Sequence, residues 1–282
     1  MTPTQYRTGC ALNYNVIGES AFIFNVSAIN NEFQKVLSES FSTNPAILVT
    51  ESRAPMEEKR LHRFQAESGS LQLCYEALVE LSHYRQTPDQ VPQIPPAELP
   101  PDVLPYIYPS RYCESDKLTR LALYEFGNFP TGFSQVTAIC NYVRDNIEYL
   151  PGSTCQSTSA HNTVTERTGV CRDFSHLAIA FCRALSIPAR FVSGYAIDLN
   201  PPDFHAHFEA YLGGRWYIFD PTRLSPQTSF VRIGTGRDAA DTSFATIFGN
   251  VQFLSMKVTM EYVSGPRPEF TTDAISTSQL IS

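Results

Sequence analysis

Hydrophobic and polar residues alternate along the first part of the chain as they do in β-strands. Residues 20–26 and 71–79 carry β-branched and aromatic side chains at partly alternating positions, and turn-forming pairs such as Ser68-Gly69 separate these runs. The pattern predicts an N-terminal antiparallel β-domain over residues 1–87. No group of reactive side chains stands out in it, so we expect it to shape access to a site elsewhere.

A proline-rich segment follows this domain. Residues 88–109 hold eight of the 20 prolines. Proline fixes φ and lacks a backbone donor, so this density excludes a helix or a central strand. The segment is predicted to be an extended strap that lies on the protein surface. A ligand for a proline-binding domain is the alternative.

The rest of the chain mixes helical and strand periodicity. Helices are expected over residues 115–127, 133–147 and 170–186. Strands are expected over residues 189–197, 204–212, 215–219 and 251–262. Gly213-Gly214 is expected to form a two-residue turn. These elements predict a second, α+β domain over residues 110–265, with helices on an antiparallel sheet, and a Ser/Thr-rich, poorly packed tail over residues 266–282.

Composition and charge narrow the class of protein. Hydrophobic residues make up 43% of the chain and charged residues 17%, which is typical of a globular protein. The net charge of −7 argues against a nucleic-acid or anionic-membrane partner. We find neither a secretory leader nor a membrane-spanning apolar run. Seven scattered cysteines without a C-x-x-C pair favour a reducing compartment, so a cytoplasmic location is expected.

Cys171 is the candidate nucleophile. It precedes the apolar segment 177–185 and is expected at the start of a helix. The unpaired N–H groups and the positive end of the helix dipole at such a position stabilise a thiolate. Arg172 and Asp173 are expected to support the helix start as an ion pair or cap. By contrast, Cys140 and Cys182 are expected in the core, and Cys155 is expected to be a bystander on a loop.

Two histidines and an aspartate follow on later strands. His205 and His207 point to the same face of one strand, so alternation does not separate them. A plain turn at Gly213-Gly214 would place His207 opposite Asp220 and His205 diagonal to it. A cysteine, a histidine and an aspartate can act as nucleophile, base and orienting acid. A zinc site on Cys171, His205 and His207 is the competing interpretation.

Taken together, the three blocks resemble the bacterial branch of the transglutaminase-like cysteine enzymes. The resemblance covers about residues 130–225 and is carried by GVCRDFSHLAIAFCRALSIPARFVSGYA around Cys171, DFHAHFEAYL around the histidines, and GGRWYIFDPT around Asp220. It implies a papain/transglutaminase-like core. The histidine that opens the His-Ala pair, His205, is then the base and Asp220 its partner, with no cofactor or metal. Many members carry tryptophan where this chain has His207.

The resemblance also implies the reaction. The Cys171 thiolate would attack a peptide or amide carbonyl, with its own backbone N–H and a second donor within residues 149–157 stabilising the oxyanion. Water as acceptor gives a protease or amidase, which is the preferred function. An amine as acceptor gives a transglutaminase, and a non-catalytic binding protein is the alternative from another class. A peptide or protein substrate is expected, and the oligomeric state is left open.

Overall fold

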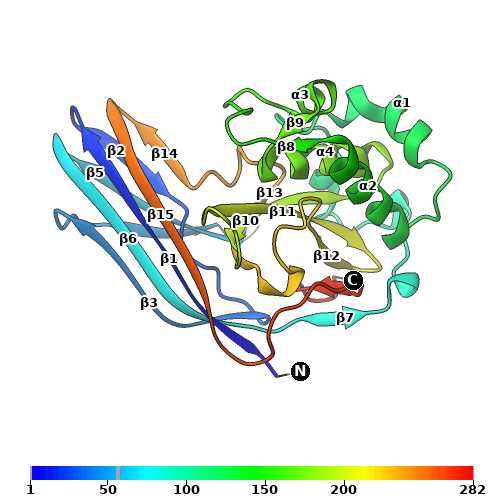
Figure 1. The fold of residues 1–282 in the computed structure, drawn as a ribbon, viewed down its shortest axis with the longest axis horizontal. Coiled ribbons are helices and arrows are strands. Elements are labelled where there is room, and N and C mark those ends of the chain that lie inside the picture. Colours follow the sequence, from blue (N-terminus) through cyan, green and yellow to red (C-terminus); the bar gives the residue numbers. More distant parts are fainter. Residues whose placement is uncertain (1, 55–57, 282) are drawn as a thin grey trace.

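The structure is a computed structural model that describes residues 2–54 and 58–281. A sandwich of two antiparallel sheets leans against an α+β unit whose helices cover one side of a third sheet (Figure 1). The predicted α+β architecture behind an antiparallel β-domain is therefore confirmed. Within the described residues, no helix is long and apolar enough to cross a membrane.

The sandwich is built from strands whose alternate side chains are buried. One sheet has the order β15-β1-β6-β3 and the other the order β14-β2-β5-β4. Along β6, every second residue from Leu71 to Leu81 faces the core between the sheets. The strands are β1 (Thr4–Val16), β2 (Ser20–Phe24), β3 (Gln34–Asn44), β4 (Thr50–Ala54), β5 (Lys59–Ala66), β6 (Gly69–Leu81), β14 (Ala245–Phe248) and β15 (Val251–Ser264).

Two strands of this sandwich come from the far end of the sequence, which corrects the predicted domain boundaries. The late strand expected over residues 251–262 exists as β15, but it pairs along its length with β1, and β14 pairs with β2. Local periodicity can show that a segment forms a strand, but it does not show which strand it pairs with. The sequence therefore placed residues 245–264 with the α+β domain, whereas they pair with strands of the sandwich. The 110–265 segment therefore contains two strands, β14 and β15, that pair with strands of the first 24 residues.

The α+β unit contains a six-stranded sheet of order β13-β10-β11-β12-β16-β7. Its strands are β7 (Tyr84–Gln86), β10 (Ala189–Tyr195), β11 (Phe204–Leu212), β12 (Arg215–Phe219), β13 (Val231–Gly236) and β16 (Ala274–Ser276). The predicted turn at Gly213-Gly214 is present. Both glycines have positive φ, which favours glycine, and Leu212 pairs with Arg215.

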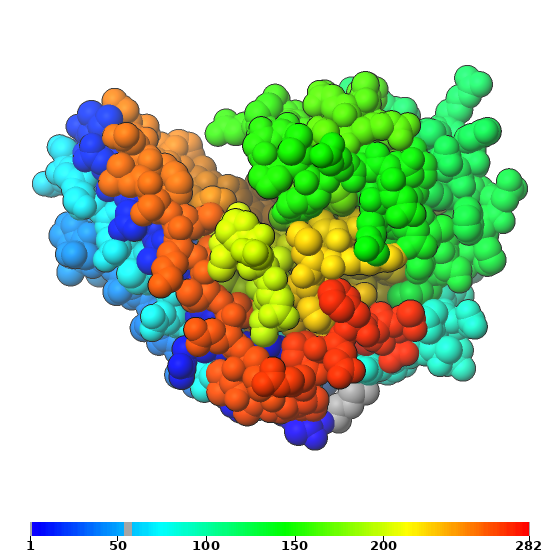
Figure 2. All heavy atoms as spheres, in the orientation of Figure 1, coloured from blue at the N-terminus to red at the C-terminus, as the bar shows by residue number. Residues whose placement is uncertain are grey.

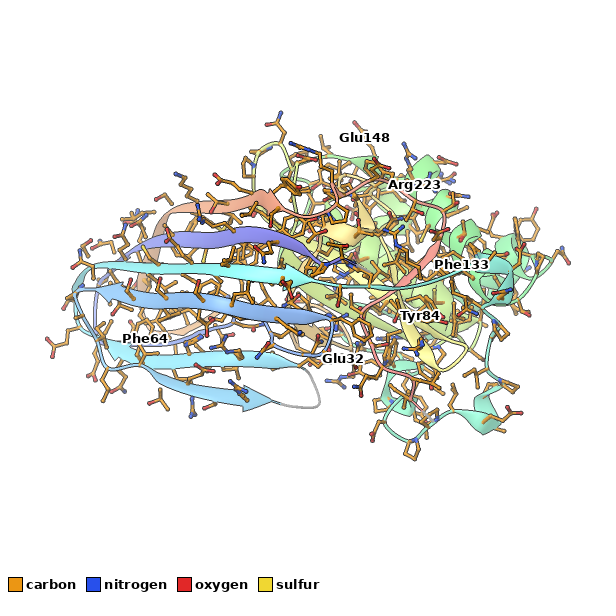
Figure 3. The ribbon with its side chains drawn as sticks, turned by 90° about the horizontal axis from the view of Figure 1, so that it is seen from below. Glu32, Phe64, Tyr84, Phe133, Glu148 and Arg223 are labelled. Atoms are coloured by element: carbon orange, nitrogen blue, oxygen red, sulfur yellow. The ribbon has the colours of Figure 1, made fainter. Side chains whose placement is uncertain are left out.

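Four helices pack on this sheet through a shared apolar core (Figure 1). They are α1 (Ser115–Phe126), α2 (Phe133–Asn146), α3 (Ala160–Glu166) and α4 (Cys171–Ala184). The three predicted helices are confirmed, and the short α3 is a further helix that the sequence analysis did not predict. Cys140 and Cys182 are buried in this core, as predicted. Figure 3 views the molecule from below, with the long sandwich strands on one side and the helical half, carrying Phe133 and Arg223, on the other.

The strap and the tail both pack on the α+β unit. Residues 88–109 contain three short 3₁₀ turns and hold Tyr106 against Trp216, with ring centroids 5.2 Å apart. Part of the segment expected to be a strap therefore lies against β12. The prediction of a poorly packed tail is wrong, because β16 is buried between β12 and β7. The Ser/Thr-rich composition around this strand gives no sign that it pairs with β12 and β7.

Candidate active site

Cys171 is the first residue of α4, as the sequence predicted. Val170 is extended and caps the helix, and its N–H donates to Asp173 Oδ2 at 3.0 Å. A Cβ at Gly169 would lie 2.7 Å from the Asp173 Cβ, so only glycine fits before this cap. The backbone thus turns sharply into the helix and leaves the half-buried Cys171 at its N-terminal end.

Arg172 and Asp173 brace the same turn. Arg172 Nη2 lies 3.0 Å from Asp173 Oδ1 and also donates to the Cys155 carbonyl at 2.8 Å. Thr154 donates to the fully buried Asp173 carboxylate at 3.1 Å. The predicted ion pair and cap are confirmed, and they tie the loop before α3 to the start of α4.

His205 on β11 and Asp220, which directly follows β12, form a buried pair. His205 Nε2 lies 2.9 Å from Asp220 Oδ2, and both side chains are almost completely buried. The other carboxylate oxygen, Oδ1, accepts from the Thr222 N–H at 2.9 Å and from its hydroxyl at 2.7 Å. The turn after β12 therefore fixes the Asp220 carboxylate, and the carboxylate fixes the imidazole ring.

The strand register shows how this pair arises. Phe208 pairs with Phe219 without a bulge between β11 and β12, so Asp220 lies one position further along, beside His207. Its carboxylate nevertheless reaches diagonally to His205. The His207 ring instead stacks on Phe230 with centroids 4.3 Å apart, and its Nδ1 has no hydrogen-bond partner among the described residues.

Cys171 lies beside His205, and both side chains line the same pocket. Because Nε2 of His205 faces Asp220, Nδ1 is the ring atom left for the thiol. Burial disfavours the charged imidazolium, but the Asp220 carboxylate and the Cys171 thiol outweigh burial and raise the pKa of His205 to about 10. Burial would raise the pKa of Asp220, yet His205 and Thr222 lower it. Burial lowers the pKa of His207, so that ring is neutral.

The raised pKa of His205 predicts a pH dependence of stability. In the unfolded chain histidine has a pKa near 6.5, whereas in the folded protein the pKa of His205 is about 10. Its stabilising contribution is therefore complete below about pH 6.5 and is lost as the pH rises towards 10. Urea unfolding of the wild type and of His205→Gln at pH 6.5 and pH 10 should show a gap in unfolding free energy that narrows at the higher pH. A gap that widens would contradict the charged state of His205.

Tyr149 approaches Cys171 from another element. A two-residue strand, β8 (Glu148–Tyr149), pairs in parallel with β9 (Thr168–Gly169), which leads directly into Cys171. The Tyr149 ring lies 5.7 Å from that of Phe174, one turn into α4. Its phenol lies near the backbone N–H and the thiol of Cys171, and burial raises the pKa of this phenol.

A pocket of about 660 Å³ opens beside Cys171 and His205. Its walls come from α4, from β10 and β11, and from residues 239–245, which lead into the sandwich strand β14. Figure 2 shows a hollow between the sandwich strands β14 and β15 (orange) and the helical part of the chain (green). The sandwich thus lies beside the cleft, as expected for a domain that shapes access.

Comparison with known proteins places this geometry in a family. Residues 124–221 match the transglutaminase-like superfamily model, and residues 4–102 match the bacterial transglutaminase N-terminal domain. The crystal structure of a “putative cysteine protease” from Cytophaga hutchinsonii is 43% identical, covers 97% of both chains and has a TM-score of 0.94. The chain belongs to the transglutaminase-like superfamily.

Two curated mycobacterial relatives match over a shorter range. An uncharacterized protein of Mycobacterium leprae is 33% identical over 118 residues, 38% of this chain and 41% of that protein. An uncharacterized protein of Mycobacterium tuberculosis is 34% identical over 119 residues, 36% of this chain and 38% of that protein. The transglutaminase-like chain therefore spans about two fifths of the length of these curated relatives.

Cys155 of this transglutaminase-like protein lies on the loop before α3, outside the Cys171–His205–Asp220 group. Cys155 is exposed on the loop that Arg172 holds, and hydrogen bonds from Ser157 and Thr158 lower its pKa to about 7. Across residues 2–54 and 58–281, no three His, Cys, Asp or Glu side chains are arranged to hold a metal ion. The Cys171–His205–His207 zinc interpretation therefore has no support in the geometry.

Sequence reasoning missed most of the pocket wall. Residues 239–245 and Tyr112 carry no motif and lie far from Cys171 in the sequence, so only the fold brings them to the site. Tyr149 falls within residues 149–157, where a second oxyanion donor was expected, but the sequence did not single it out.

Proposed function

We propose that this transglutaminase-like protein is a thiol-dependent hydrolase of peptide or amide bonds that forms an acyl-enzyme on Cys171. The observation that carries the proposal is the buried His205–Asp220 pair, which lies beside a cysteine at a helix start in the same pocket. Cysteine nucleophiles with a neighbouring imidazolium are activated in this way.

In the proposed reaction, Cys171 and His205 act in both half-reactions, the formation and the hydrolysis of the acyl-enzyme. The Cys171 thiolate adds to the carbonyl carbon, and the oxyanion accepts a hydrogen bond from the Cys171 N–H. The imidazolium of His205 then protonates the leaving amine as the C–N bond breaks, which leaves a thioester. His205 next takes a proton from water, the resulting hydroxide attacks the thioester, and the carboxylic acid product leaves with Cys171 again a thiolate. Asp220 holds the ring orientation throughout.

Tyr149 is our candidate for the second oxyanion donor. Its phenol lies near the Cys171 N–H that the oxyanion would use, so a substrate carbonyl oxygen must displace it. A displaced hydroxyl that turns towards the same oxygen could donate its own proton. The short β8–β9 pairing holds the ring within reach.

Hydrolysis is preferred over transfer to an amine. The name of the Cytophaga hutchinsonii relative, which is similar over almost the whole chain, supports a protease. All seven cysteines are free thiols, which supports a reducing compartment such as the cytoplasm. Amine transfer remains the second candidate, because the same thioester could be attacked by a lysine or a small amine.

Hydrolysis and amine transfer are distinguished by whether water or an amine receives the acyl group. The protein is incubated with a mixed peptide library in H₂¹⁸O, with and without glycine ethyl ester as an amine acceptor, and the products are identified by mass spectrometry. We expect carboxylate products that contain ¹⁸O with or without the amine, and none with Cys171→Ala. Products that carry the amine in preference to ¹⁸O would show a transglutaminase, and products that persist in Cys171→Ala would exclude the thiol mechanism.

A further inference from the structure

The pocket beside Cys171 has an aromatic lining that the proposed reaction does not require. Four rings from four separate segments of the chain contribute to it: Tyr112, Phe191, Phe204 and Phe244. Ile233 and four alanines extend the apolar surface. The volume of about 660 Å³ lies within the usual range of ligand sites, of the order of 300–1,000 Å³.

The charged residues at this pocket already have partners within the protein. Arg172 is bonded to Asp173 and to the loop carbonyl of Cys155. Asp203 accepts from the N–H of its neighbour Phe204 at 2.7 Å. The Arg111 guanidinium lies over the Tyr112 ring, 5.1 Å from its centroid. The surface left for a ligand is therefore mainly apolar.

A buried histidine holds one wall of the pocket in place. The His176 ring lies 5.1 Å from Tyr112 and 5.0 Å from Phe191, and its Nε2 accepts from the Ala239 N–H at 3.1 Å. Burial lowers the pKa of His176, so the ring stays neutral and Nε2 remains an acceptor. One side chain thus fixes two aromatic rings and the loop opposite them, and the wall is formed before any ligand enters.

The opposite wall is Phe244, which the sandwich positions. Its ring stacks on Phe204 with centroids 5.1 Å apart at 24°, and Phe204 is next to His205 in β11. The Phe244 carbonyl accepts from the Asn25 N–H, just after β2, at 2.9 Å. The ring is still 39% exposed, so a face remains free for a ligand.

We propose that this pocket receives an aromatic or large aliphatic side chain of the substrate, close to the bond that Cys171 attacks. The inference rests on the proposed function and adds the substrate class: an extended peptide with a bulky apolar residue at the scissile bond. Such a side chain would leave water and pack against the four rings, and the burial of its apolar surface would stabilise the bound substrate. The sandwich then influences substrate selection, because it positions Phe244.

Two thiol reagents test the pocket without any turnover. N-phenethyl chloroacetamide and N-ethyl chloroacetamide share one reactive group, and in both the Cys171 thiolate forms an S–C bond as chloride leaves. We expect the phenethyl reagent to alkylate Cys171 about 10- to 100-fold faster, because its ring is buried in the pocket. Exposed Cys155 in the same chain should show no such preference, and peptide mapping separates the two sites.

Variants of the pocket wall show which residues cause the preference of Cys171 for the phenethyl reagent. Phe244→Ala should lower the phenethyl-to-ethyl rate ratio at Cys171 by about fivefold, since it removes one ring contact. Phe248→Ala is the matched control, because Phe248 lies on β14, is 62% exposed and is outside the pocket. If Phe244→Ala disturbs folding, Ala240→Trp fills the pocket from an exposed position and should abolish the preference.

Two results would overturn the proposal: equal ratios at Cys171 and Cys155, or a ratio that neither Phe244→Ala nor Ala240→Trp lowers. Alkylation needs no acyl transfer, so the preference can be found even if the protein hydrolyses nothing. Conversely, hydrolysis without the preference would leave the proposed function in place and remove only the substrate class.

Discussion

Replacing His205 by alanine is expected to lower kcat by about a thousandfold or more, whereas His207→Ala should cost about tenfold. His205 is hydrogen-bonded to Asp220 and lies beside Cys171, so its removal takes away the proton donor and the thiolate partner together. The His207 ring stacks on Phe230 with centroids 4.3 Å apart. Steady-state kinetics on the best peptide from the library, with both variants checked for folding by circular dichroism, would measure the difference.

Asp220→Asn is the companion variant. It keeps the shape of the side chain but removes the charge that raises the pKa of His205, so it should resemble the His205 variant in kcat with little change in KM. If His207→Ala proves more damaging than His205→Ala, the diagonal pairing seen between β11 and β12 does not describe the working site.

The second large effect concerns stability and arises at Glu209. Its carboxylate is fully buried, accepts from Arg190 Nε at 2.7 Å, and forms a second ion pair with Arg232. Both arginines are themselves almost fully buried, and Glu58 is their other acidic partner. Glu209→Ala should lower the free energy of unfolding by about 3–5 kcal/mol, because it leaves buried cations without their main counter-charge.

Thermal and urea unfolding of the Glu209 variant measure this loss. A drop of about 10 °C in Tm is expected for a chain of this size. Lys117→Ala is the control, because its pair with Glu114 is solvent-exposed and should leave unfolding unchanged. A Glu209→Ala protein as stable as the wild type would show that the arginine side chains reach water or other partners once the carboxylate is gone.

Local periodicity predicted the elements of this fold but not their long-range partners. The stripe on α2 and the glycine pair between β11 and β12 are local signals, and the structure contains both. The pairing of β15 with β1 joins residues about 250 positions apart in the sequence, and no residue in either strand marks the other. The same limit concealed β16 in a tail rich in serine and threonine.

The sequence could predict those residues of the candidate site that carry a local signal. Cys171 is marked by the helix start, and Asp220 by the end of a strand before a proline. The register alone favoured His207, and only the family motif favoured His205. A carboxylate just beyond the end of β12 can reach diagonally, which a strict pairing argument does not capture. Phe244 could not be predicted as part of the site. Contacts with the sandwich bring it to the pocket beside Cys171, and no local sequence signal marks those contacts.

The most direct test of the central claim is the detection of an acyl-enzyme on Cys171. The protein is mixed with a peptide p-nitrophenyl ester, quenched in acid within the first turnover, and analysed by intact-mass spectrometry and peptide mapping. We predict one added acyl group, located on Cys171, which disappears as free carboxylic acid is released and which does not form in Cys171→Ala. Turnover without an adduct on Cys171, or an adduct on another residue, would contradict a thiol nucleophile supported by His205 and Asp220.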